Sequence, residues 1–183
     1  MLLCAIMIFN GAFLFAQTDA KKQAEKTNEP KFEDTKLEKD VDFVVNAADG
    51  GMYEVQLAEL AKKKSSNPKI KELAQKMITD HTKANEELKS VASKKNITLP
   101  SKMSNKLQDK FDKLNKLEGK EFDEKYADQM VSDHKEDIDL FQKEADKGKD
   151  GELKAWAAGK LPTLKHHLQM AEDADKSADN KTK

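Results

Sequence analysis

Four long segments of the chain carry apolar residues at spacings of three and four, and this periodicity constrains the fold more than any other feature. Such spacing places the apolar side chains along one face of an α-helix. The chain has only 7 Gly and 4 Pro, so few residues interrupt these segments. We therefore predict an all-α protein. The four predicted helices span residues 37–64, 68–96, 121–147 and 151–174.

The lengths of the three connections indicate how these helices are arranged. The first and third connections, around residues 65–67 and 147–150, are short enough to join antiparallel neighbours. The second, NITLPSKMSNKLQDKFDKLNKLEGK, is long enough to run back along the bundle and contains an amphipathic stretch between Leu107 and Leu117. This order predicts a ferritin-like four-helix bundle with a long, helix-containing crossover between helices 2 and 3. An up-and-down bundle with an extra helix in its loop is the alternative.

The two ends of the chain differ in composition from the predicted bundle, which spans residues 39–174. Residues 1–20 begin with the apolar run MLLCAIMIFNGAFLFA, which is shorter than the roughly 20 apolar residues of a membrane-spanning helix. We interpret this part as a signal peptide or N-terminal apolar segment, which predicts export to the periplasm or cell envelope. An uncleaved N-terminal anchor is the alternative. Residues 21–38 and 175–183 are charged without apolar periodicity, which predicts a disordered linker and a disordered tail.

The charge and motif content of the chain argue against several functions. The formal net charge is −1, so no excess of positive charge would attract nucleic acid. The chain contains no arginine, and so it lacks the planar donor group that grips phosphate with two hydrogen bonds. No Gly-rich phosphate loop, G-x-S-x-G or H-E-x-x-H motif occurs. We predict no nucleic-acid partner, no nucleotide and no catalytic residue, and a protein of the cell envelope is the partner that export suggests.

Three of the four histidines fall on the apolar stripes of three different helices. MITDHTKA and MVSDHKED place His81 and His134 four residues after a methionine, on the second and third helices. His167 lies three residues after Leu164 on the fourth helix, and Glu54 reaches the small-residue face of the first. Each of these four residues lies near the middle of its helix. We therefore expect them to meet at the centre of the bundle.

Buried ionisable groups are costly unless they are paired, hydrogen-bonded or bound to a metal. Three imidazoles and one carboxylate suit a divalent transition ion such as zinc, iron, manganese or copper. The predicted metal ligands are Glu54, His81, His134 and His167. Without a metal, the same residues would form a buried polar network that keeps the helices in register. The chain would then be a non-catalytic structural or interaction protein of the envelope.

Two aspartates and three methionines accompany the predicted ligands. Asp80 and Asp133 each precede a histidine and point about 100° around the helix, where they could orient an imidazole of a neighbouring helix. The alternative is that they are surface carboxylates paired with lysines. Met77, Met130 and Met170 lie within one turn of the histidines; thioether sulfur would favour copper, although methionine also fills gaps in cores. The Glu-x-x-His pairs of di-iron bundles are absent.

Four segments also carry a resemblance to a known family. They are FVVNAADGGMYEVQLAELA, AQKMITDHTKANEELKSVASKKNITLP, GKEFDEKYADQMVSDHKEDIDLF and LKAWAAGKLPTLKHHLQMAEDA. Over about residues 39–174 the chain resembles the bacterial domain-of-unknown-function family 4142, described as ferritin-like and often labelled as an outer-membrane protein. The resemblance implies a helical bundle in an exported protein and brings no established activity or cofactor. The positions that match the family pattern are Glu54, Asp80, His81, Asp133, His134 and His167, whereas His166 is not one of them.

Overall fold

The structure, a computed structural model, describes residues 19–179 and shows no strand within them. The helices are α1 (Ala20–Phe32), α2 (Glu38–Lys64), α3 (Pro68–Lys94), α4 (Asn105–Asn115), α5 (Gly119–Lys147) and α6 (Gly151–Asp179). The prediction of an all-α protein is therefore confirmed. The four predicted helices correspond to α2, α3, α5 and α6.

Local capping signals explain why helices begin where the sequence periodicity begins. α3 starts at Pro68, whose missing N–H costs nothing in a first turn. The side chain of Asn67 accepts a hydrogen bond from the N–H of Lys69, at 3.0 Å. The hydroxyl of Ser104 accepts one from the N–H of Leu107 and so caps α4.

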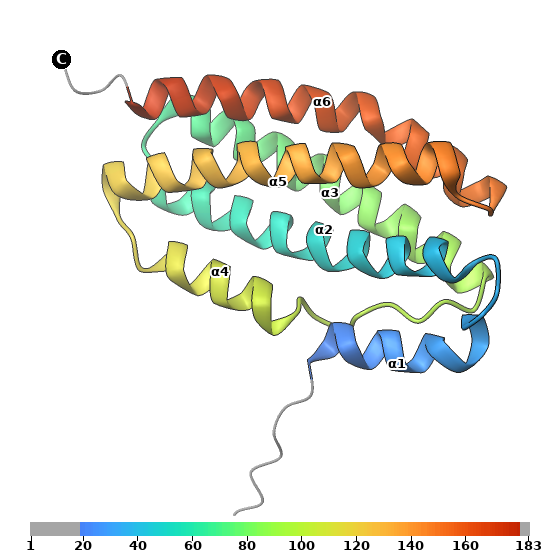
Figure 1. The fold of residues 1–183 in the computed structure, drawn as a ribbon. Coiled ribbons are helices and arrows are strands. Elements are labelled where there is room, and N and C mark those ends of the chain that lie inside the picture. The colour runs from blue at the N-terminus through green and yellow to red at the C-terminus, as the bar shows by residue number, and fades with distance from the viewer. Residues whose placement is uncertain (1–18, 180–183) are drawn as a thin grey trace, which may run out of the picture.

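The long helices form two antiparallel hairpins joined by a crossover (Figure 1). α2 pairs with α3, and α5 pairs with α6. After α3 the chain returns along the bundle through residues 95–104 and then α4, which contacts α2 and α5. α3 and α5 consequently run in the same direction (Figure 1). The predicted helix-containing crossover is present between the second and third long helices.

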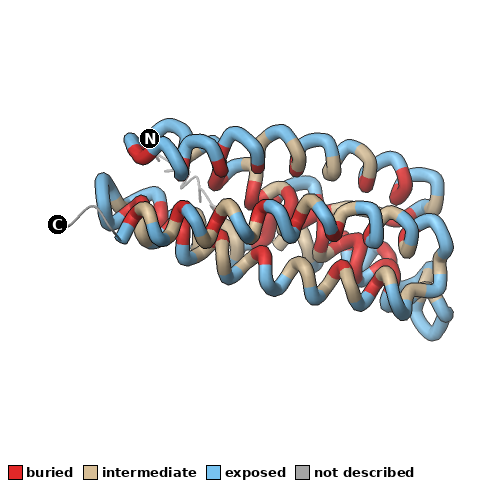
Figure 2. Tube along the Cα trace, turned by 90° about the horizontal axis from the view of Figure 1, so that it is seen from above, coloured by how far each residue is buried: buried red, intermediate tan, exposed pale blue. Residues whose placement is uncertain are grey.

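The core consists of two clusters of buried apolar side chains. The first includes Leu57 and Leu73 and lies towards the turn between α2 and α3. The second includes Val44, Leu88 and Phe141 and lies towards the opposite end of the bundle. In Figure 2 the buried residues follow the sides of the long helices that face one another, as amphipathic helices require.

Helix α1 occupies most of the segment for which the sequence predicted a disordered linker, residues 21–38, and that prediction is wrong. Ala20, Ala24 and Asn28 recur every four residues and form its buried face. The side chain of Asn28 donates a hydrogen bond to the carbonyl oxygen of Thr98 and accepts one from its N–H, both at 2.8 Å. Since this face contains small and polar residues, apolar periodicity does not reveal it.

The C-terminal prediction is also wrong in part, because α6 continues through residues 175–179. Ala178 is buried in this last stretch, as is Ala174 just before it. The hydroxyl of Ser177 hydrogen-bonds with the side chain of Asn67, at the turn between α2 and α3. These contacts stabilise a helical end that its own composition does not predict.

The predicted signal peptide or N-terminal apolar segment, residues 1–20, lies outside the described residues except for its last two positions. Among the helices within residues 19–179, none combines the length and the apolar character that crossing a membrane requires. Export to the periplasm or cell envelope stays a prediction.

Two buried carboxyl groups lie close together at the turn between α5 and α6. Asp40, near the start of α2, accepts hydrogen bonds from the N–H groups of Lys149 (2.8 Å) and Asp150 (2.6 Å). Glu144 is buried, and its Oε1 has no hydrogen-bond partner among the described residues. Burial, and then the neighbouring Asp40, raise the pKa of Glu144 to about 7. The folded protein therefore favours the protonated form of Glu144.

We expect Glu144→Gln to stabilise the protein at pH 8 but not at pH 4. The pKa of Glu144 rises from 4.5 to about 7 on folding, so the free energy of unfolding falls as pH increases between these values. Glutamine carries no charge at any pH, so the variant does not lose this stability. At pH 8 its free energy of unfolding should exceed that of the wild-type protein by roughly 1 kcal/mol once solvent screening is allowed for. Thermal melts at both pH values measure the effect. Exposed Glu86 provides the control variant, Glu86→Gln, and equal gains at both pH values would contradict the prediction.

Candidate metal centre

Four buried polar side chains, one from each long helix, lie between the two apolar clusters. On α3, for example, Met77 belongs to the first cluster and Leu88 to the second, and a histidine lies between them. These side chains are at most 7% exposed. The structure thus brings together the four residues that the sequence predicted to meet. They are Glu54 from α2, His81 from α3, His134 from α5 and His167 from α6.

The three imidazole rings lie close to one another. The centroid of the His81 ring is 5.8 Å from that of His134 and 5.2 Å from that of His167. The centroids of His134 and His167 are 5.4 Å apart. One ring nitrogen from each histidine lies within 4.8 Å of one from each of the other two. This grouping of three nitrogen donors is what a metal ion would need.

The hydrogen bonds of two rings determine which nitrogen carries the proton. Nδ1 of His134 lies 2.9 Å from the carbonyl oxygen of Met130. A carbonyl can only accept, so Nδ1 donates and Nε2 keeps its lone pair in the neutral ring. Nε2 of His167 lies 2.9 Å from Oδ2 of Asp80. Burial alone would raise the pKa of Asp80, but hydrogen bonds from Lys76 and His167 hold it below its ordinary value, so this carboxylate accepts and the lone pair of His167 is on Nδ1.

The third ring is held by the carboxyl group of α2. Nδ1 of His81 lies 2.9 Å from Oε2 of Glu54, which leaves Nε2 of this ring without a partner. Nε2 of His134 and Nδ1 of His167 are likewise buried without a hydrogen-bond partner among the described residues. Each histidine therefore uses one nitrogen to fix its orientation and leaves the other free. This division of roles is usual for histidines that bind metals.

The three histidines are neutral at neutral pH. Burial, and then the nearby rings of His81 and His167, lower the pKa of His134 to about 3. Burial and His81 lower the pKa of His167 to about 4, although Asp80 opposes them. Burial also lowers the pKa of His81. We call His81, His134 and His167 together the histidine layer. Because the neutral imidazole is the form that binds a metal, this layer would not have to lose protons before binding one.

Residues 20–174 match the family described as "Domain of unknown function (DUF4142)". The match covers most of the 183 residues. The chain belongs to this family. Searches of curated proteins and of solved structures each returned no match. The DUF4142 match begins at residue 20 and so includes α1, which the sequence had placed outside the folded domain.

In this DUF4142 chain, Glu54 lies beside the three histidines and does not belong to the group of mutually close donors. Its Oε2 contacts His81, and its Oε1 is 3.7 Å from Nδ1 of His134. Nδ1 of His81 and Nδ1 of His134 are the nitrogens whose contacts fix the orientation of the two rings. The carboxyl group of Glu54 therefore contacts these nitrogens and not the free Nε2 atoms. Burial, and then Asp133, raise the pKa of Glu54 to about 8. Its contact with Nδ1 of His81 helps to fix the orientation of that ring.

Sequence reasoning missed Asp137, a fifth polar residue of this DUF4142 site. Its side chain hydrogen-bonds with that of Glu54. Burial, and then Glu54, raise the pKa of Asp137 well above its ordinary value. One signal could have revealed it, because Asp137 lies seven residues after Met130 and so falls on the same face of α5.

The two predicted orienting aspartates have different surroundings. Asp80 contacts His167 of a neighbouring helix, in the arrangement that the sequence suggested. Asp133 contacts no histidine, and its assignment as an orienting residue is not supported by the contacts. Its Oδ1 accepts hydrogen bonds from Gln129 (2.7 Å) and Lys110 (3.3 Å). α5 turns Asp133 towards α4, whose position the sequence periodicity does not specify.

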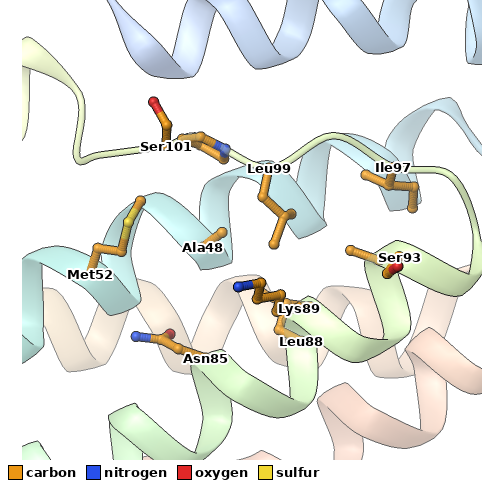
Figure 3. Close-up of a pocket in the computed structure, with 11 residues that line it drawn as sticks. Ala48, Met52, Asn85, Leu88, Lys89, Ser93, Ile97, Leu99 and Ser101 are labelled. Atoms are coloured by element: carbon orange, nitrogen blue, oxygen red, sulfur yellow. The ribbon is translucent and has the colours of Figure 1, made fainter.

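Three surface pockets of this DUF4142 bundle differ in whether they reach the four predicted site residues. A groove of about 520 Å³ between α2, α3 and the connection after α3 is lined largely by apolar side chains, among them Met52 and Leu99 (Figure 3). It contains none of the four predicted site residues. A second pocket, of about 410 Å³, reaches Glu54 from the side of α4. A third, of about 140 Å³, reaches His81 and His167 between α3 and α6.

Proposed function

We propose that this protein binds a single transition metal ion at the centre of its helical bundle, through one nitrogen of each of three histidines. The ligands are Nε2 of His81, Nε2 of His134 and Nδ1 of His167. The observation that carries the proposal is that these three buried nitrogens have no hydrogen-bond partner among the described residues, while the opposite nitrogen of each ring has one.

A metal ion satisfies these nitrogens better than water or an empty space does. A buried nitrogen without a hydrogen-bond partner costs about 1–3 kcal/mol, and the three rings contain three such nitrogens. One water molecule has only two protons and could satisfy two lone pairs at most. A cation attracts all three lone pairs together.

The distances between the nitrogens fit an ion after a small movement of side chains. Two nitrogens that bind a tetrahedral ion at about 2.0–2.1 Å lie roughly 3.4 Å apart. One nitrogen of each ring lies within 4.8 Å of one nitrogen of each of the other two, so closure around an ion requires such a set to approach by about 1.5 Å at most. Small rotations of the rings about their side-chain bonds can supply that movement. The contact of Asp80 with His167 would guide it, as carboxylates commonly do for metal-binding histidines.

The chemistry of the donors favours zinc or copper over manganese. Imidazole nitrogen suits zinc, copper, iron and nickel, whereas manganese prefers carboxylates and water. In the proposed site Glu54 orients His81 and does not contact the ion. The thioether groups give copper no added support, because Met77 and Met130 belong to the first apolar cluster and Met170 packs against it. Three protein ligands leave a fourth position open in a tetrahedral site.

Titration of the purified protein with single metals tests the proposal. The full chain should carry no histidine tag and should be stripped with a chelator before calorimetric titration with Zn(II), Cu(II), Co(II) or Mn(II). We expect one equivalent of zinc or copper to bind with a Kd of about 1 µM or lower, and manganese to bind far more weakly. If none of these metals binds below about 100 µM, the metal proposal fails. The histidine layer would then be a metal-free polar network.

A further inference from the structure

The pocket of about 140 Å³ between α3 and α6 connects the histidine layer with solvent. Its inner end is formed by buried side chains, including His81, His167 and Phe141. Its outer rim includes exposed Lys83 and half-buried Thr163. Two of the three proposed metal ligands thus line a route to the surface, whereas His134 is enclosed.

This pocket is large enough to admit a small molecule. Its volume of about 140 Å³ is several times the roughly 30 Å³ that a water molecule occupies in the liquid. A linear or planar molecule of three or four non-hydrogen atoms fits the same volume.

The charges of the pocket favour an anion. The charged residues of the pocket are Lys83, Lys160 and Asp80. Lys160 is ion-paired with Glu87, so Lys83 at the rim is the positive charge that is left to attract an anion. Asp80 is already engaged by Lys76 (2.9 Å) and by His167 (2.9 Å). A divalent ion at the histidines would add further positive charge at the inner end.

We propose that a small monovalent anion enters between α3 and α6 and binds the metal at its open fourth position. This inference rests on the proposed function, since the anion binds the ion that the three histidines hold. Thr163 can donate a hydrogen bond from the pocket wall, and Lys83 attracts the anion at the rim. The protein then presents a metal with an exchangeable ligand, in contrast to a closed structural site.

Azide binding to the copper-loaded full chain tests this inference. Azide is a linear anion of three atoms, and its binding to Cu(II) is measured from the charge-transfer absorption that it produces. We expect saturable binding to the wild-type protein. Thr163→Leu fills the pocket and should weaken azide binding at least ten-fold, with unchanged affinity for copper. Thr79→Leu, an exposed position on α3 outside this pocket, is the matched control and should change neither.

Charge reversal at the rim gives an independent measurement if the leucine variant folds poorly. Lys83→Glu should weaken azide binding by about five-fold, whereas Lys165→Glu, exposed on α6 and outside the pocket, should not. A copper-loaded wild-type protein whose spectrum azide leaves unchanged would overturn the open position while the metal proposal stands. If neither Thr163→Leu nor Lys83→Glu weakens azide binding, the proposed entry of the anion between α3 and α6 is refuted. A wild-type chain that binds no metal would overturn both proposals.

Discussion

Replacement of His134 by alanine is expected to abolish tight metal binding. His134 is completely buried, and its Nε2 is one of the three nitrogens proposed to bind the ion. Changes to residues that merely orient a ligand typically reduce metal affinity by 10–100-fold, so loss of a ligand should cost at least about a hundred-fold. Calorimetric titration of the chelator-stripped variant with zinc or copper measures the loss. Its far-ultraviolet circular dichroism should match that of the wild-type protein.

His166 provides a matched control for this result. It is exposed on α6, next to His167, and lies in a separate surface pocket. His166→Ala removes the same chemical group from the surface of the bundle and should leave the affinity unchanged. If His166→Ala weakens binding as strongly as His134→Ala does, the ion binds at a surface position and the central site is refuted.

Replacement of His134 by leucine is expected to have opposite effects on the metal-free and metal-loaded proteins. In the metal-free protein, leucine removes a buried nitrogen that has no partner and fills a similar volume with apolar atoms. This change should raise the free energy of unfolding by about 1–3 kcal/mol, which is roughly 2–10 °C in melting temperature for a chain of this size. Buried polar groups can often be replaced by apolar ones with such a gain.

Added metal should offset the lower free energy of unfolding of the wild-type protein relative to the leucine variant. Free metal at about 100 times its Kd stabilises the folded state by about 2.7 kcal/mol, whereas the leucine variant should gain almost nothing. Thermal melts with and without zinc measure both effects. Met77→Leu, a change between apolar residues in the neighbouring cluster, controls for general repacking and should keep the metal response.

A different outcome would favour the structural alternative. If the metal-free His134→Leu protein melts well below the wild-type protein, the histidine layer stabilises the fold by its own hydrogen bonds. The contact of His134 with the carbonyl oxygen of Met130 would then be worth more than the unpartnered nitrogen costs. The experiment thus separates a layer that binds metal at some cost in stability from one that keeps the helices in register.

The meeting of the four polar residues could be predicted because each lies on a buried stripe near the middle of its helix. Helical periodicity determines the direction of a side chain relative to its own helix, and burial determines which direction faces the core. Their individual roles could not be predicted in this way. The contact of Asp80 with His167, and that of Asp133 with Lys110, depend on how neighbouring helices are rotated and spaced.

The same distinction separates Glu54 from the three histidines. Periodicity places all four at the centre, but only the packed structure shows that the carboxyl group contacts Nδ1 of His81 and lies beside the group of close nitrogens. Differences of 1–2 Å decide whether a group binds an ion or orients a ligand. Asp137 was missed for a related reason, since a charged residue on a buried face is recognised only when its partner is known.

The sequence by itself determined the all-α class, the four long helices, the crossover and the central position of the histidines. These features follow from apolar spacing and connection length, which are local properties of the chain. Only the tertiary structure decided that residues 20–32 are helical and that α6 extends to Asp179. These two ends bury alanines and form hydrogen bonds with distant residues such as Thr98 and Asn67. Their stability comes from those contacts, because short polar helices are marginal in water on their own.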